Sequence, residues 1–179
     1  MKKLLIGALV GGILLFFWQF LSWSLLGIHN SMQSYTPKQT EVLKYLDENL
    51  EEGFYYMPNL PPEAPMEDHE KLMNESLGKP WAQVYMHKNL QMDMASNMGR
   101  GFAVAFLAVL LLTWVLMKIG KTSLFDTLLS CLAIGLMSYL TTSYPVSIWY
   151  STLSMGDLID AIASWGVVGI WLGWWLNRE

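Results

Sequence analysis

The chain has 179 residues, of which 53% are hydrophobic and 15% charged, and its formal net charge is −4 at pH 7. This acidic balance, without a basic patch interleaved with aromatic residues, argues against a nucleic acid partner. Cys131 is the single cysteine, which excludes an intramolecular disulfide.

Four apolar segments are long enough to cross a membrane as helices. The first runs 25 residues without a charged side chain, from Leu4 to Ile28, directly after Lys2 and Lys3. A bilayer core about 30 Å thick needs roughly 20 apolar residues in a helix, which satisfies its own backbone hydrogen bonds. A cleaved signal peptide has a shorter apolar run that ends in small residues, so we expect an uncleaved anchor. The predicted transmembrane helices cover residues 4–27, 101–118, 124–143 and 158–176.

The connections between the later spans are short. Residues 118–122 predict a tight turn. Pro145 is predicted to end the third span, because proline lacks the backbone N–H and disfavours helix in the residue before it. Residues 145–156 then form an interfacial connection, in which Trp149 and Tyr150 suit the depth of lipid headgroups.

The basic residues that flank the spans predict the orientation. With four crossings five of the six fall on one side, which the positive-inside rule assigns to the cytoplasm, while Arg100 precedes the second span on the other side. Both termini are then cytoplasmic, and residues 29–98 are extracytoplasmic. The five flanking residues on the cytoplasmic side are Lys2, Lys3, Lys118, Lys121 and Arg178.

Residues 29–98 predict a small folded cap rather than a flexible linker. They hold eleven acidic residues and five lysines, which gives a net charge of −6. The predicted fold class is therefore an α-helical integral membrane protein with four transmembrane helices and a small extracytoplasmic α/β cap between the first and the second.

The cap carries signals for two helices and two strands. Thr36, followed by a proline and then by a glutamine three residues on, predicts a helix start. A second helix is predicted over residues 66–77, with Gly78 suited to the left-handed position after its end. Aromatic strand candidates at 54–57 and 81–87 could pair with each other.

Three aromatic features occur together in this chain. The sequence Phe17-Trp18-Gln19-Phe20-Leu21-Ser22-Trp23 lies late in the first span, Gly53-Phe54-Tyr55-Tyr56-Met57-Pro58 lies in the cap, and the last span is rich in tryptophan. In this combination the chain resembles a group of bacterial membrane proteins of about this length, for which no activity is established. The resemblance covers most of the chain in layout. It implies a bacterial four-span protein and carries over no functional residue.

Three predicted spans each carry, in their outer half, a pair of polar side chains three or four residues apart. The two members of such a pair face the same side of their helix. Unpaired polar groups are costly in hydrocarbon, so these should point inward. There they either form interhelical hydrogen bonds, which is their commoner use, or line a small pocket open to the outside. Trp18, Tyr139 and Trp165 would form its walls. The candidate ligand-binding residues are Gln19, Ser22, Ser138, Tyr139, Thr142, Asp160 and Ser164.

Asp160 is the one acidic residue that could lie a turn inside the membrane, where it could relay protons. It also fits a helix N-terminal capping pattern with Ser154 and Asp157, and Ser123 with Asp126 repeats this pattern at the third span. We favour capping as the role of Asp160.

The most metal-like cluster combines methionine and histidine, whose thioether and imidazole groups suit Cu(I). Its spacing fits no rigid ligand template and methionine commonly fills gaps in packing, so we expect neither a metal site nor another cofactor. His29 and His69 are isolated in the sequence and are expected to face solvent. The weak metal candidates are His87, Met92 and Met94, together with Met86 and Met98.

Two pairs of glycines predict close helix approach. Gly7 and Gly11 in the first span, and Gly169 and Gly173 in the last, each have the spacing that lets backbones come together. Spans one and four are expected to touch there, and the alternative is that one of these faces binds a second copy of the chain or another membrane protein.

No activity follows from these motifs. The sequence contains no nucleophile elbow, phosphate-binding loop or dinucleotide fingerprint, so we expect a protein that is not an enzyme. The leading hypothesis is a structural or interaction component of the bacterial inner membrane with a periplasmic cap, embedded in the lipid bilayer. The alternative is a carrier or binding protein for a small solute, a lipid or a proton that uses the polar pocket. Two further hypotheses, an enzyme of lipid or cell-envelope chemistry and a protein that handles copper, are less favoured than these two.

Overall fold

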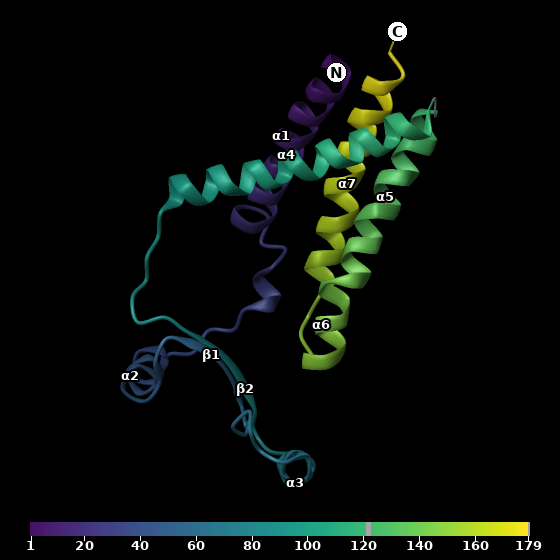
Figure 1. Ribbon diagram of the computed structural model, residues 1–179. Coiled ribbons are helices and arrows are strands. Elements are labelled where there is room, and N and C mark those ends of the chain that lie inside the picture. The colour runs from purple at the N-terminus through teal and green to yellow at the C-terminus, as the bar shows by residue number, and fades with distance from the viewer. Residues whose placement is uncertain (121–122, 179) are drawn as a thin grey trace. The chain divides into compact units, whose positions relative to one another are not determined.

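The computed structural model describes residues 1–120 and 123–178 and divides the chain into two compact units (Figure 1). Unit 1 holds Met1–Ser34 and the residues from Asp93 onward, and unit 2 holds Tyr35–Met92. Residues 121 and 122 of the predicted turn, and with them the basic flank Lys121, lie outside the described residues. The elements of unit 1 are α1 (Lys2–Ser24), the 3₁₀ helix η1 (Asn30–Met32), α4 (Met94–Ile119), α5 (Leu124–Thr141), α6 (Ser143–Tyr150) and α7 (Met155–Leu176).

Among the described residues, four helical segments are long and apolar enough to cross a membrane: α1, α4, α5 with its continuation α6, and α7. Their large apolar side chains lie mostly on the outside of unit 1, as Phe17, Leu111 and Ile170 do. An apolar exterior of this extent suits lipid tails better than water. The prediction of a mostly helical chain with four such helices is confirmed.

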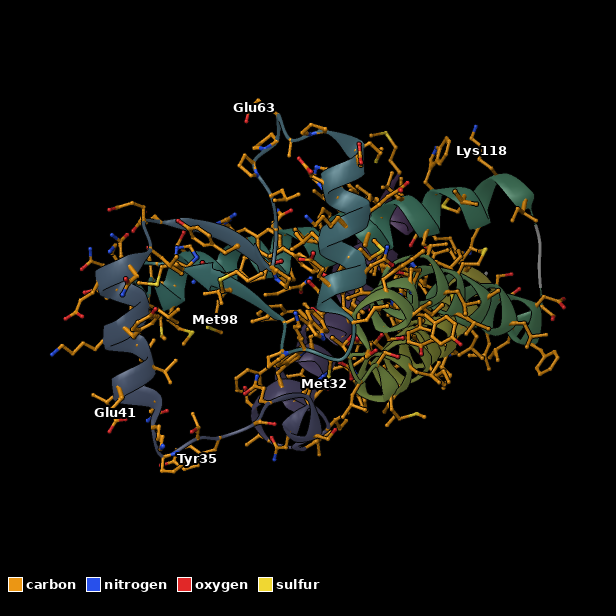
Figure 2. All side chains as sticks on the ribbon, turned by 90° about the horizontal axis from the view of Figure 1, so that it is seen from below. Met32, Tyr35, Glu41, Glu63, Met98 and Lys118 are labelled. Atoms are coloured by element: carbon orange, nitrogen blue, oxygen red, sulfur yellow. The ribbon has the colours of Figure 1, made fainter. Side chains whose placement is uncertain are left out.

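The core of unit 1 forms where α1 packs against α4 and α7, and where α5 packs against α7. In Figure 1, α4 crosses α1 and α7 at a wide angle, and Met98 and Lys118 lie near its opposite ends in Figure 2. The buried apolar side chains at the centre include Leu15, Val109 and Leu172.

The glycines of α1 allow its neighbours to approach closely. A Cβ atom on Gly11 would lie 2.7 Å from Cγ1 of Val109 in α4, and one on Gly7 would lie 3.0 Å from Cδ1 of Trp175 in α7. The indole of Trp171 also donates a hydrogen bond to the Gly7 carbonyl at 2.9 Å. The predicted contact between the first and last spans is therefore present.

The glycines of α7 face a different helix from the one expected. A Cβ atom on Gly169 would lie 3.0 Å from Cβ of Cys131, and one on Gly173 would lie 2.9 Å from the Leu124 carbonyl oxygen, both in α5. Sequence spacing predicts that a small residue permits close approach but not which helix approaches. Both glycine pairs therefore pack against other helices of this chain.

The ends of α5 show one prediction confirmed and one corrected. At its start, the Ser123 hydroxyl accepts from the Asp126 backbone N–H at 3.0 Å, and Asp126 reciprocates in a capping box. At its end, the helix breaks at Thr142 as the proline suggested, but α6 follows at once and includes Pro145. Pro145 lies in the first turn of α6, where an N–H would have no intrahelical acceptor, so its absence is tolerated.

Unit 2 is a two-stranded antiparallel sheet with two helices. Its elements are α2 (Gln39–Asn49), β1 (Gly53–Met57), α3 (Met66–Ser76) and β2 (Ala82–Met86). Phe54 lies opposite Tyr85, with ring centroids 4.6 Å apart, which confirms the predicted strand pair. Gly78 follows α3 with a φ of +75°, as predicted, whereas α2 begins after Thr36 and its proline rather than at them. Thr36 instead accepts from the Lys38 N–H in the turn before the helix.

Candidate functional site

The carboxylate of Asp160 on α7 is the centre of a buried polar cluster in unit 1. Its Oδ1 accepts from Trp18 Nε1 at 3.0 Å and from Ser22 Oγ at 2.5 Å, both on α1. Its Oδ2 lies 2.9 Å from Nε2 of His29. The two oxygens of an ionised carboxylate only accept hydrogen bonds, and each can accept more than one, so three donors can surround this group.

His29 reaches this cluster because the chain turns back after α1. Gly27 adopts a φ of +62°, which starts the turn that leads into η1. The imidazole stacks on Trp23, with centroids 3.9 Å apart and planes 6° apart, and a Cβ on Gly156 would lie only 2.9 Å from its Nδ1. His29 is 3% exposed, so the expectation that it faces solvent is wrong.

Sequence patterns did not indicate the role of His29, because its partner lies 131 residues away. Two signals could have suggested it: it is the first titratable side chain after the first span, and Asp160 is the one acidic residue placed inside the outer half of a predicted span, since Asp126 lies at the opposite end. A buried charge needs a partner, and His29 is the nearest candidate at the matching end of α1.

The cluster of serine, histidine and aspartate does not form a hydrolase triad. In such a triad the imidazole faces the nucleophile with one nitrogen and the carboxylate with the other. Here Nε2 of His29 faces both Ser22, at 3.2 Å, and Asp160, while Nδ1 lies 3.1 Å from Sδ of Met32. Ser22 donates to the carboxylate rather than to the imidazole, so the arrangement activates no nucleophile.

A cavity of about 450 Å³ lies beside this cluster, between α1, α4, α5 and α7. We name it the polar cavity. Six of the seven residues predicted to bind a ligand line it, and the seventh, Ser22, lies behind it on Asp160. Those six are Gln19, Ser138, Tyr139, Thr142, Asp160 and Ser164.

Some of these side chains form interhelical hydrogen bonds and others do not. Ser22 bonds to Asp160, and the Tyr139 hydroxyl lies 3.0 Å from Ser154 Oγ, so both act as links between elements. By contrast, the Ser164 hydroxyl has no hydrogen-bond partner within the described part of the chain, although Ser164 is only 5% exposed. Since Ser164 lines the polar cavity, its hydroxyl is available to a ligand there.

The predicted walls are partly right. Tyr139 and Trp165 line the polar cavity, and Trp23 joins them. Trp18 does not line it but supports Asp160 from the side, because its indole donates to the carboxylate.

Asp160 is not a cap, contrary to our expectation. Ser154 does occupy the N-cap position of α7, but its side chain forms no capping hydrogen bond. Asp157 lies in the first turn, whereas Asp160 bonds to groups on α1 and to His29. The capping pattern predicts the helix start correctly but assigns the wrong role to the residue one turn further in.

The metal candidates do not form a site of titratable ligands: within the described ranges, no group of three or more His, Cys, Asp or Glu side chains could hold a metal ion. His87 and Met92 are exposed and belong to unit 2, while Met94, also exposed, belongs to unit 1. Met86 is buried in unit 2, as expected of a packing residue.

No protein-family model, no curated protein and no solved structure matches this chain. The function of the site is therefore inferred from its geometry.

Proposed function

We propose that this chain is a multi-pass membrane protein that binds or carries a small polar solute, free or as a lipid headgroup, in the polar cavity. The observation that carries the proposal is the convergence of polar side chains from α1, α5 and α7 around one cavity of about 450 Å³. That volume falls within the range of about 300–1,000 Å³ found for small-molecule sites.

The polar groups themselves support binding over a purely structural role. A hydroxyl inside an apolar helix bundle is costly without a partner, so a structural network would be expected to pair its members. The hydroxyl of Ser164 has no partner among the described residues, and since no buried side-chain oxygen or nitrogen of those residues is left unpaired, this hydroxyl is open to the cavity. A ligand, or water that a ligand displaces, would satisfy it.

The proposed setting is a bacterial inner membrane, with both termini in the cytoplasm and unit 2 outside. The basic flanks support this orientation through the positive-inside rule. With it, the polar cavity lies toward the extracytoplasmic end of the spans, since it is lined by the C-terminal half of α1 and the N-terminal half of α7.

A role as an interaction component is the second candidate, and unit 2 favours it. Its sheet carries the exposed aromatic side chains Phe54 and Tyr85, which suit contact with another protein. Crosslinking at Tyr85 in intact membranes should then recover one reproducible protein, and recovery of none would remove this candidate.

A cavity-filling variant tests the binding role. Ala108 on α4 lines the polar cavity, whereas Ala103 on the same helix is exposed and does not line it. The purified protein is screened by thermal shift against four solute classes: amines, neutral polyols, carboxylates and phosphate esters. We expect one class to raise the melting temperature of the wild type and of Ala103→Phe, but not of Ala108→Phe.

Two outcomes would contradict the proposal. One is that no class of solute changes the melting temperature. The other is that Ala108→Phe responds as Ala103→Phe does, because a ligand unaffected by filling the cavity binds elsewhere.

A further inference from the structure

The charged side chains that line the polar cavity are all acidic. Two carboxylates, Asp157 and Asp160, line it, and among the described residues no lysine, arginine or histidine does. His29 contacts Asp160 from behind rather than lining the cavity. A ligand there meets the carboxylate of Asp157 without a basic side chain beside it in the lining.

We infer that the ligand of the polar cavity carries a small organic ammonium group and that Asp157 is its anionic anchor. This inference rests on the proposed binding function and adds the chemical class of the ligand. Of the two carboxylates, Asp157 is the more available, because the oxygens of Asp160 already accept from Trp18, Ser22 and His29. The side chain of Asp157 forms no hydrogen bond or ion pair with any described residue.

The walls of the cavity fit an organic cation. The aromatic side chains of Trp23, Tyr139 and Trp165 line it together with Asp157. An ammonium group over an aromatic face is attracted by the ring quadrupole, and more strongly when water is excluded. The free hydroxyl of Ser164 can accept from an N–H donor or pair with a hydroxyl on the ligand.

A bare metal ion fits less well. Ca²⁺ and Mg²⁺ require six or more oxygens at short range, and transition metals prefer imidazole and thiolate ligands. The polar cavity has a volume of about 450 Å³, and its walls combine one unpaired carboxylate with hydroxyl groups and three aromatic side chains. These properties favour a larger and softer cation.

A second hollow adjoins the polar cavity at Asp157. It has a volume of about 660 Å³, lies between η1, α6 and the start of α7, and shares Thr142, Ser143 and Asp157 with the polar cavity. Asp157 therefore lies where the two spaces meet. A cation that enters the second hollow meets Asp157 before it reaches Ser164.

The test uses choline and its neutral carbon isostere, 3,3-dimethylbutan-1-ol, which differ in charge but hardly in shape. Binding of each to the purified full-length chain is measured by equilibrium dialysis in detergent. We expect choline to bind at least about tenfold more tightly than the isostere, and Asp157→Asn to weaken choline binding by about tenfold or more. Asp68→Asn, which changes an exposed acid of unit 2, is the control and should bind choline as the wild type does.

The source of the ammonium group is distinguished in lipid nanodiscs. If the natural ligand is a lipid headgroup, nanodiscs rich in phosphatidylcholine should compete with free choline, whereas nanodiscs of phosphatidylglycerol should not. If it is a free solute, choline binding should be equal in both. Either result supports the inference.

Equal binding of choline and its isostere would overturn the inference, and this comparison needs no variant to fold. Choline binding that survives Asp157→Asn unchanged would overturn the role of Asp157. If a neutral or anionic solute instead binds and Ala108→Phe abolishes its binding, the proposed function stands and the inference about charge fails.

Discussion

At the scale of single residues, Asp160 explains why its neighbours are where they are. Trp18 and Ser22 donate to it from α1, and His29 folds back to reach it. Hydrogen bonds to a charged group are stronger than neutral ones, and leaving one partner of a buried set unpaired costs more than the bond itself contributes. The cluster therefore links α1 to α7 at this end of unit 1.

Replacing His29 tests the cluster. We expect His29→Ala to lower the free energy of unfolding by about 1–3 kcal/mol, because Asp160 loses a donor and the imidazole leaves a gap. His29→Gln can still donate to the carboxylate and should recover part of the loss. The measurement is SDS-induced unfolding in mixed micelles.

His87→Ala is the matched control, since His87 is exposed in unit 2. It should change the unfolding free energy little. If His29→Ala proves no more destabilising than His87→Ala, the cluster does not hold α1 to α7.

Helical spacing pointed to six of the side chains that line the polar cavity, but not to Ser143 or Asp157. Gln19, Ser138 and Ser164 repeat on one face of their helices, and the cost of polar groups in lipid turns that face inward. The position of His29 could not be predicted in this way, because it depends on a turn at Gly27 and on a contact with a distant segment.

At the scale of elements, glycines set how closely the helices approach. Gly135 on α5 faces α7 so closely that a Cβ atom would lie 2.6 Å from the carbonyl oxygen of Ala161 and 2.6 Å from Cδ1 of Trp165. The first of these atoms is backbone and can move only if the helix moves. The contact between α5 and α7 therefore depends on this glycine.

A larger side chain at Gly135 should separate the two helices. We expect Gly135→Val to destabilise unit 1 by about 1–3 kcal/mol, the usual cost of overpacking, in the same SDS unfolding assay. A Cβ atom on Gly99 of α4 would meet no other atom within 4 Å, so Gly99→Ala should be neutral or stabilise by about 0.5–1 kcal/mol through helix propensity. Equal effects of both substitutions would show that α5 and α7 do not pack as described.

The elements themselves were largely predictable, and the exceptions have physical causes. Apolar length identified α1, α4, α5 and α7, and paired aromatic runs identified the two strands. The interfacial connection was wrong in part, because Pro145 falls in the first turn of a new helix, where proline is tolerated. The partners of Gly169 and Gly173 depend on tertiary packing, which residue spacing does not encode.

At the scale of the whole molecule, the proposed topology sets which side each segment faces. Cys131 is the only cysteine and is fully buried, so single cysteines introduced elsewhere can report accessibility. Glu63 lies in unit 2 and Lys118 at the end of α4 (Figure 2).

Labelling of intact bacterial cells with a membrane-impermeant maleimide checks the topology. We expect Glu63→Cys to be labelled from outside, and Lys118→Cys to be labelled only after the cells are opened. The native chain with Cys131 alone is the control and should remain unlabelled in both conditions. The opposite pattern would invert the orientation and place the polar cavity toward the cytoplasm.

The most direct test of the proposed function is whether the polar cavity is open to small cations from the water. Ser164→Cys places a thiol in it, and the purified protein is treated with the aminoethyl and sulfonatoethyl methanethiosulfonates, which carry opposite charges. The ratio of the two reaction rates with the protein thiol is divided by the same ratio measured with 2-mercaptoethanol, which corrects for the intrinsic reactivity of the reagents. We expect the thiol at position 164 to be modified while Cys131 is not, and the normalised ratio to favour the cationic reagent. A thiol at position 164 as unreactive as Cys131 would contradict an open polar cavity, and with it the proposed function.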